Sequence, residues 1–176
     1  MSASAAVLVI DMQVGLVSIG YQGHEVLLRI ADLLDRARRA TVPILHVQHH
    51  HSTYAPLMAG APTWHIHPAV APAEGEIVIG KTASDSFYRT SLEDELRRLG
   101  TTQLIVTGMQ TEFCVDTTCR RALSLGFDVT LVSDAHTTKD ALLPAEQIIK
   151  YHNSILPAVA HPDRRLIVKP SSEILF

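Results

Sequence analysis

The 176-residue sequence has few cysteines and few aromatic residues, which make up 5% of the chain. Its two cysteines, Cys114 and Cys119, stand five positions apart in a stretch expected to be helical. Because a helix rises about 1.5 Å per residue, their Cα atoms would lie too far apart for a disulfide. Free thiols are typical of a reducing compartment, so we expect a cytoplasmic protein.

An excess of charge of either sign is also missing. The chain carries 15 Lys+Arg against 18 Asp+Glu, for a formal net charge of −3. This balance argues against nucleic acid or an anionic membrane as the main partner and favours a small-molecule substrate. The start, Met1–Ile10, has no basic residue before its short apolar run, and Asp11 interrupts that run. We therefore expect no export signal and no membrane anchor.

Three motifs that would define other functions are absent. No G-x-G-x-x-G follows a predicted strand, which excludes a dinucleotide-binding domain. The cysteines are spaced Cys-x-x-x-x-Cys, whereas thiol-disulfide oxidoreductases use Cys-x-x-Cys. A phosphoacceptor receiver domain needs a second Asp after its third strand, where this chain has Lys81.

Short β-branched runs alternate with segments of helical period along the whole chain, which predicts an α/β fold with a six-stranded parallel sheet. A chain of this length can bury roughly 70% of its unfolded surface, so we expect a single domain over residues 1–176. The predicted strands are Ala5–Ile10, Pro43–Gln48, Glu76–Ile79, Gln103–Thr107, Asp128–Val132 and Leu166–Val168. The predicted helices are Val26–Ala37, Leu92–Leu99, Cys114–Gly126 and Pro144–Leu156. The connection His49–Gly75 shows neither period, and a loop of that length is usually functional.

Polar and reactive residues follow several of the predicted strands. Asp11 follows the first strand, Lys81 the third, Gly108 the fourth and Asp134 the fifth, and Gly108 leads on to Cys114. Ligands of open α/β sheets bind outside the carboxyl ends of the strands, so these side chains would meet in one crevice. We expect Asp134 to brace the loops at the sheet rim rather than to take part in chemistry.

Cys114 is the strongest candidate nucleophile. At the start of a helix, and near an ammonium such as that of Lys81, a thiolate would be stabilised. Free backbone N–H groups of the loop before it would form an oxyanion hole, and Asp11 would exchange protons with the thiol. Each residue also has an ordinary interpretation, in which the Cys is a small buried hydrophobe, the Asp a helix cap and the Lys a solvated charge.

Four segments together resemble the isochorismatase-like cysteine hydrolase superfamily. They are Val7–Gln13, then Ile79–Lys81 with Ser86–Phe87 and Thr90–Leu92, then Val106–Val115, and then Val132–Ala135. The resemblance implies a Rossmann-like three-layer α/β/α sandwich with strand order 3-2-1-4-5-6. It also implies dimers or tetramers. Members that cleave a vinyl ether lack the cysteine, so its presence favours the amidase branch.

The resemblance also implies roles for individual residues. Cys114 would be the nucleophile, Asp11 the general acid/base, and Lys81 the cation that keeps Asp11 charged and lowers the thiol pKa. A cis peptide bond is implied at Met109–Gln110, where it would aim the N–H groups of Gln110 and Cys114 at the oxyanion. The implied reaction hydrolyses an amide, lactam or ureido C–N bond through a thioester. Candidate substrates are nicotinamide-like amides, N-carbamoyl amino acids, ureidoacrylate and the lactam of streptothricin-type antibiotics.

The histidine-rich connection departs from the resemblance. Nicotinamidases hold a divalent metal with an Asp-x-His pair after the second strand, and here His49 stands in the place of that Asp. We expect no metal cofactor, while His49, His51 and His67 remain candidate ligands for a divalent ion such as Zn²⁺. Their alternative role is that of polar residues at the mouth of a pocket.

A substrate pocket is expected around the same connection. Trp64, Phe87 and Phe113 would form an apolar wall, with Gln13 beside them, although a Trp in such a loop is also commonly a plug over the core. A protein of this kind that binds a small molecule without turnover is the alternative function.

Overall fold

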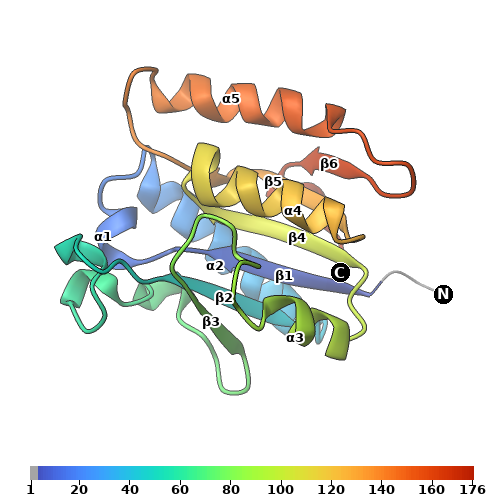
Figure 1. Ribbon diagram of the computed structural model, residues 1–176, viewed down its shortest axis with the longest axis horizontal. Helices are drawn as coiled ribbons and strands as arrows, with labels where there is room; N and C mark the ends of the chain where they lie inside the picture. The colour runs from blue at the N-terminus through green and yellow to red at the C-terminus, as the bar shows by residue number, and fades with distance from the viewer. Residues whose placement is uncertain (1–3) are drawn as a thin grey trace.

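Six strands form one parallel sheet in the computed structural model, which describes residues 4–176 (Figure 1). The strands are β1 Ala5–Ile10, β2 Ile44–His49, β3 Ile77–Lys81, β4 Gln103–Met109, β5 Asp128–Thr137 and β6 Leu166–Lys169. Their order in the sheet is β3-β2-β1-β4-β5-β6. The predicted α/β class and the strand order 3-2-1-4-5-6 are confirmed.

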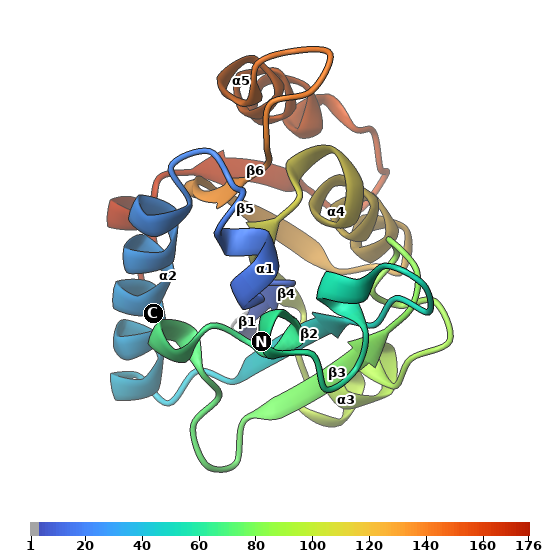
Figure 2. The ribbon, with the colours of Figure 1, turned by 90° about the vertical axis from the view of Figure 1, so that its left-hand side faces the viewer.

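Helices cover both faces of the sheet. They are α1 Val14–Val17, α2 Gly23–Arg39, α3 Leu92–Arg98, α4 Asp116–Ser124 and α5 Ala145–Ile155. Figure 2 shows α2 on one face, α3 and α4 on the other, and α5 beyond the β6 end. Because side chains alternate along a strand, Val7 and Val9 of β1 pack with α2, whereas Leu8 and Ile10 pack in the core under α3 and α4. No helix within residues 4–176 combines the length and apolar character that a membrane crossing requires.

Strand β5 is longer than the sequence predicts. We expected it to end at Val132, but it continues to Thr137 and pairs His136 with Gly108 and Thr137 with Met109 after a shift of register. Polar residues at its predicted end suggested a loop. Asp134 instead accepts hydrogen bonds from the backbone N–H and the hydroxyl of Ser171, which is the bracing role that we expected for it.

Gly108 makes the approach of β4 to β1 possible. It has φ +117°, and a Cβ at this position would collide with the backbone of Ile10. Only glycine combines this backbone conformation with such close contact. The loop that follows Gly108 is therefore brought directly beside the carboxyl end of β1, where Asp11 lies.

The long connection between β2 and β3 has little regular structure, as expected, and contains three short 3₁₀ turns at 55–57, 62–64 and 68–70. It is tied back to the start of α1 by an antiparallel bridge between Gln13 and Ile66. Helix α1 itself was not predicted, because four residues are too few to show a helical period. The connection and α1 lie side by side at the carboxyl end of the sheet (Figures 1 and 2).

Candidate active site

A buried ion pair joins the ends of two strands that are not neighbours in the sheet. The ammonium Nζ of Lys81 lies 2.8 Å from Oδ2 of Asp11, and both side chains are at most 1% exposed. The ammonium also donates to the backbone carbonyls of Ala83 and Ser84, at 3.1 and 3.4 Å. The side chain of Lys81 passes the end of β2 to reach Asp11. It thereby spans the two strand spacings between β3 and β1.

Asp11 is held at a sharp turn at the end of β1. Its φ is +52°, a left-handed conformation that aspartate tolerates better than most residues do. Apart from the contact with Lys81, neither carboxylate oxygen accepts a hydrogen bond from any residue in the described range. The carboxylate therefore keeps free lone pairs beside the crevice, as a proton acceptor requires.

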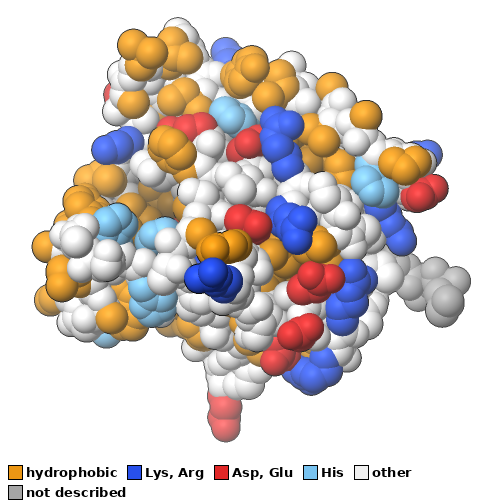
Figure 3. All heavy atoms as spheres, viewed as in Figure 1, with side chains coloured by type: hydrophobic (Ala, Val, Ile, Leu, Met, Phe, Trp, Pro, Cys, Tyr) orange, Lys and Arg blue, Asp and Glu red, His pale blue; other side chains and the backbone are white. Residues whose placement is uncertain are grey.

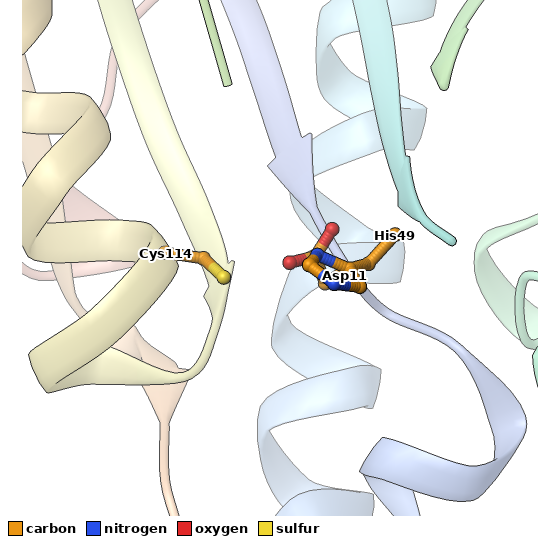
Figure 4. A group of neighbouring side chains, drawn as sticks. All are labelled: Asp11, His49 and Cys114. Carbon is orange, nitrogen blue, oxygen red and sulfur yellow. The ribbon is translucent and has the colours of Figure 1, made fainter. Parts of the chain in front are cut away.

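Cys114 lies in a wide helical turn that precedes α4. The π-helical segment Thr111–Val115 runs into α4, so Cys114 is the fourth residue of a helical run rather than its first, as we had expected. The carbonyl of Gln110 accepts hydrogen bonds from the N–H groups of Phe113 and Val115, but not from the N–H of Cys114 between them. The partly buried thiol points from this turn toward Asp11 across the strand ends (Figure 4).

The electrostatics of the thiol differ from the expectation. Burial raises the pKa of Cys114 to about 12, and the negative charge of Asp11 adds to this effect. Lys81 lowers the pKa of the thiol, as expected for its ammonium, but burial outweighs this effect and the pKa lies above its usual value. For Lys81, burial lowers the pKa, but the neighbouring Asp11 and, to a smaller extent, Cys114 outweigh burial and raise the pKa overall. The resting site therefore holds a neutral thiol beside a carboxylate and an ammonium.

The loop between β4 and Cys114 carries the implied cis bond. The peptide bond between Met109 and Gln110 is cis. The backbone N–H of Gln110 donates no hydrogen bond to any residue among residues 4–176. The side-chain nitrogen Nε2 of Gln110 is also buried without a hydrogen-bond partner in this range. Met109 contributes only backbone here, because its side chain is completely buried in the core under α2. Gln110 thus presents unused donors next to Cys114.

His49, at the end of β2, adds a third polar group to Asp11 and Cys114. One nitrogen of its ring, one carboxylate oxygen and the sulfur all lie within 4.8 Å of one another (Figure 4). Burial is the main cause that lowers the pKa of His49, so the ring is neutral at neutral pH. The sequence placed His49 among candidate metal ligands but did not indicate its contact with the thiol.

The predicted histidine ligands do not gather around one point. Among residues 4–176, Asp11, His49 and Cys114 form the one group of three potential metal ligands. His51 uses Nδ1 to accept from the N–H groups of Thr53 and Tyr54, and His67 uses Nδ1 to accept from that of Ala69. Within the described residues, His49, His51 and His67 therefore do not form a group of three neighbouring ligands.

Two of the four predicted pocket residues have other roles. Phe87 is 8% exposed and stacks on Phe127 in the core, so it is no pocket wall. The amide of Gln13 donates to the carbonyls of His49 and Trp64 and accepts from the N–H of His49. Gln13 is fully buried and fixes the end of β2, which corrects its predicted place in the pocket. No pattern in the sequence indicated these hydrogen bonds of Gln13.

The other two predicted pocket residues remain candidates. Phe113, next to Cys114, is 52% exposed. Trp64 is half-buried between the rings of His50 and His65, and its Nε1 is buried without a partner in the described range.

A cavity of about 490 Å³ opens next to Gln110. Its walls are formed by α1 and the residues that follow α1, by the connection between β2 and β3, by Gln110 and by Lys139. The lining residues are Leu16, Ile19, His51, Thr53, Tyr54, Leu57, Gln110 and Lys139. Histidine and apolar side chains gather over this part of the surface (Figure 3). The cavity is large enough for a small molecule.

A buried histidine fixes the turn that carries Cys114. Asn153 donates through Nδ2 to the carbonyl of Ser133, so its oxygen faces Nε2 of His136 at 2.9 Å. Nε2 must then carry the ring proton, which leaves Nδ1 to accept from the hydroxyl of Thr111, also at 2.9 Å. Thr111 is the first residue of the π-helical turn, so this chain of hydrogen bonds connects α5 to the candidate nucleophile.

The burial of His136 predicts a loss of stability in acid. Burial lowers the pKa of His136 from 6.5 to about 4, so between these values the unfolded chain binds a proton that the folded chain does not. The free energy of unfolding should fall by roughly 3 kcal/mol as pH drops through this window and should be unaffected by this group above it. Urea unfolding of wild type and His136→Gln should show a shallower fall in the variant. Equal falls would contradict the assignment.

The protein thus has an α/β fold, and a thiol, a carboxylate and an ammonium lie together at the carboxyl edge of its parallel sheet. The family model described as the isochorismatase domain matches residues 5–155. The chain belongs to the isochorismatase family.

Similar proteins include hydrolases. A streptothricin hydrolase from Streptomyces noursei is 40% identical over 139 residues, which cover 77% of this chain and 55% of that protein. The isochorismatase family protein YecD from Escherichia coli O157:H7 is 32% identical over 173 residues, which cover 89% and 90% of the two chains. A crystal structure of an isochorismatase from Pseudomonas putida KT2440 matches with a TM-score of 0.89 and 33% identity, covering 98% and 90%. The chain spans only about half the length of the streptothricin hydrolases that it matches.

Proposed function

We propose that this protein is a cysteine hydrolase that cleaves a C–N bond of a small molecule, with Cys114 as the nucleophile. The observation that carries the proposal is the buried ion pair of Asp11 and Lys81 with the thiol of Cys114 close to the carboxylate. The hydrolase activity of the named relatives supports the same reaction class.

In the proposed acylation step, Sγ of Cys114 attacks the carbonyl carbon while Asp11 takes the thiol proton. A thiol with a pKa of about 12 cannot supply enough thiolate by itself, so it requires this base. The N–H of Gln110 stabilises the oxyanion of the tetrahedral intermediate. Asp11 then returns the proton to the nitrogen, the C–N bond breaks, the amine leaves and a thioester remains.

Lys81 favours the ionised form of Asp11 before the thiol proton is transferred. A carboxylate that is 1% exposed would otherwise take up a proton, because burial disfavours charge. The carbonyls of Ala83 and Ser84 hold the ammonium and have no proton to give.

We further propose that the reaction uses no metal. The donor set fits an ion poorly, because the ammonium of Lys81 is already 2.8 Å from the carboxylate of Asp11 and would repel a divalent cation bound there. Lys81 supplies the positive charge instead.

The proposed substrate is an amide, a lactam or a ureido compound that fits the cavity next to Gln110. Streptothricin hydrolase, nicotinamidase and ureidoacrylate amidohydrolase among the relatives support these classes. The cavity walls combine apolar side chains with polar ones, and Lys139 is the charged side chain among them. This suits a compact substrate that carries both polar and apolar groups.

A hydrolysis screen tests the proposal. Wild type, Cys114→Ala and a matched Cys119→Ala variant are compared on amides, ureido compounds and lactams, with ammonia release for the first two and mass for ring opening. We expect Cys114→Ala to lose at least about 1,000-fold of the activity on the best substrate, whereas Cys119→Ala and a chelator leave it largely intact. Full activity in Cys114→Ala would refute the nucleophile, and binding without turnover in wild type would favour the non-catalytic alternative.

We also propose a homo-oligomer and a reducing, cytoplasmic location. The exposed apolar side chains of Leu142, Leu143 and Tyr151 at and before α5 support self-association, since such groups are commonly covered by a second copy. The free thiols of Cys114 and Cys119 support the location.

A further inference from the structure

His49 is built into the site more rigidly than a loop histidine needs to be. The side-chain amide of Gln13 binds both the backbone N–H and the carbonyl of His49, at 2.9 and 3.1 Å. The His49 ring lies beside Asp11, with one nitrogen within 4.8 Å of a carboxylate oxygen and of the sulfur. Its Nδ1 is buried and has no hydrogen-bond partner among residues 4–176. A buried polar atom without a partner is unfavourable, so its retention at a reactive site points to a ligand or a reacting group.

Burial of the His49 ring favours its neutral form. Burial is the largest cause that lowers the pKa of His49, while Lys81, His51 and His50 lower it further and Asp11 raises it. A neutral imidazole has one nitrogen with a proton and one nitrogen that can accept a hydrogen bond. His49 thus offers an acceptor beside Asp11 and Cys114.

Hydrolysis of a thioester on Cys114 needs such an acceptor. The attacking water has two protons, and Asp11 can take only one of them. Once acylated, the sulfur of Cys114 is no longer available, and the ammonium of Lys81 is a donor only. Of these three side chains, which the described residues place beside the carboxylate of Asp11, the ring of His49 is the one with a free acceptor for the second proton.

We propose that His49 is a further catalytic residue, which orients the water that hydrolyses the thioester; this inference rests on the proposed function. The water oxygen forms a bond to the thioester carbonyl carbon while one of its protons passes to Asp11. Its other proton remains on oxygen, hydrogen-bonded to the unprotonated nitrogen of His49. The C–S bond then breaks, the carboxylic acid leaves, and Asp11 returns its proton to the sulfur. His49 itself neither gains nor loses a proton.

The two halves of the reaction can be separated with p-nitrophenyl acetate, which releases p-nitrophenolate on acylation. Rapid mixing of the full-length protein with this ester gives the rate of the initial burst and the later steady rate, which deacylation limits. We expect His49→Ala to keep the burst rate within about 3-fold and to lower the steady rate by about 10- to 100-fold. Mass spectrometry of the quenched variant should show one acetyl group on Cys114.

Control variants make the result specific to His49. His49→Gln, which keeps an acceptor oxygen, should recover part of the steady rate, and His24→Ala on the exposed first turn of α2 should match wild type. Equal losses in burst and steady rates in His49→Ala, or no loss in either, would overturn the inference. Inhibition by a chelator with recovery on added Zn²⁺ would overturn it too, because His49 would then be a metal ligand. Ester hydrolysis by wild type that is no faster than by Cys114→Ala, with no acetyl group on Cys114, would refute the proposed function itself.

Discussion

Replacing Asp11 with asparagine should nearly abolish amide hydrolysis and at the same time make Cys114 easier to alkylate. Asparagine cannot take the thiol proton, so kcat/KM should fall by about 1,000-fold or more. The same change removes the negative charge that helps to hold the pKa of Cys114 near 12, while Lys81 continues to favour the thiolate. The pKa of Cys114 should therefore fall in the variant.

Parallel kinetics measure both effects. Hydrolysis of the best substrate is followed beside iodoacetamide labelling of Cys114 at mildly alkaline pH, with the fully buried Cys119 as the internal reference. Asp32→Asn on α2, an exposed partner of Arg36, should change neither rate. Asp11→Asn should also lower the free energy of unfolding by about 3 kcal/mol, because Lys81 stays buried without its partner. Slower alkylation together with lost hydrolysis would show that Asp11 acts only by holding the fold.

Replacing Lys81 with methionine should cause the second large loss. Methionine fills a similar volume but leaves the carboxylate of Asp11 buried without a cation, and a lone buried carboxylate takes up a proton. A protonated Asp11 cannot act as the base, so activity at neutral pH should fall by about 100-fold or more. Raising the pH should restore part of it, because Asp11 then ionises again.

The dependence of kcat/KM on pH is the measurement for Lys81→Met. We expect its acidic limb to move to higher pH than in wild type. Lys150→Met provides a matched control, since Lys150 is largely exposed on α5 and pairs weakly with Glu146. An unmoved acidic limb with reduced activity at every pH would mean that Lys81 has no influence on the ionisation of Asp11.

The parallel sheet could be predicted from patterns that a single sequence displays, and the order of its strands from the resemblance to the isochorismatase-like superfamily. Short β-branched runs alternate with helical periods, and the segments around Asp11, Lys81 and Cys114 resemble one family in order and spacing. The convergence of these residues follows from the parallel sheet, since each lies at or beyond the carboxyl end of a strand.

The details that the sequence could not predict depend on contacts between distant segments. Phe87 was expected in the pocket, but its ring stacks on that of Phe127 in the core. Its position next to a family motif carries no information about this contact. Gln13 binds the backbone of His49, and backbone acceptors carry no residue signature. The raised pKa of Cys114 results from the depth of burial, which spacing does not reveal.

The most direct test of the account is to look for the covalent intermediate. Wild type and Cys114→Ala are mixed with the best substrate, quenched in acid during turnover and analysed by intact-protein mass and peptide mapping. The account predicts that the acyl part of the substrate is attached to the peptide containing Cys114 in wild type and is absent from the variant. Turnover in wild type with the acyl group on another residue, or undiminished turnover in Cys114→Ala, would contradict it.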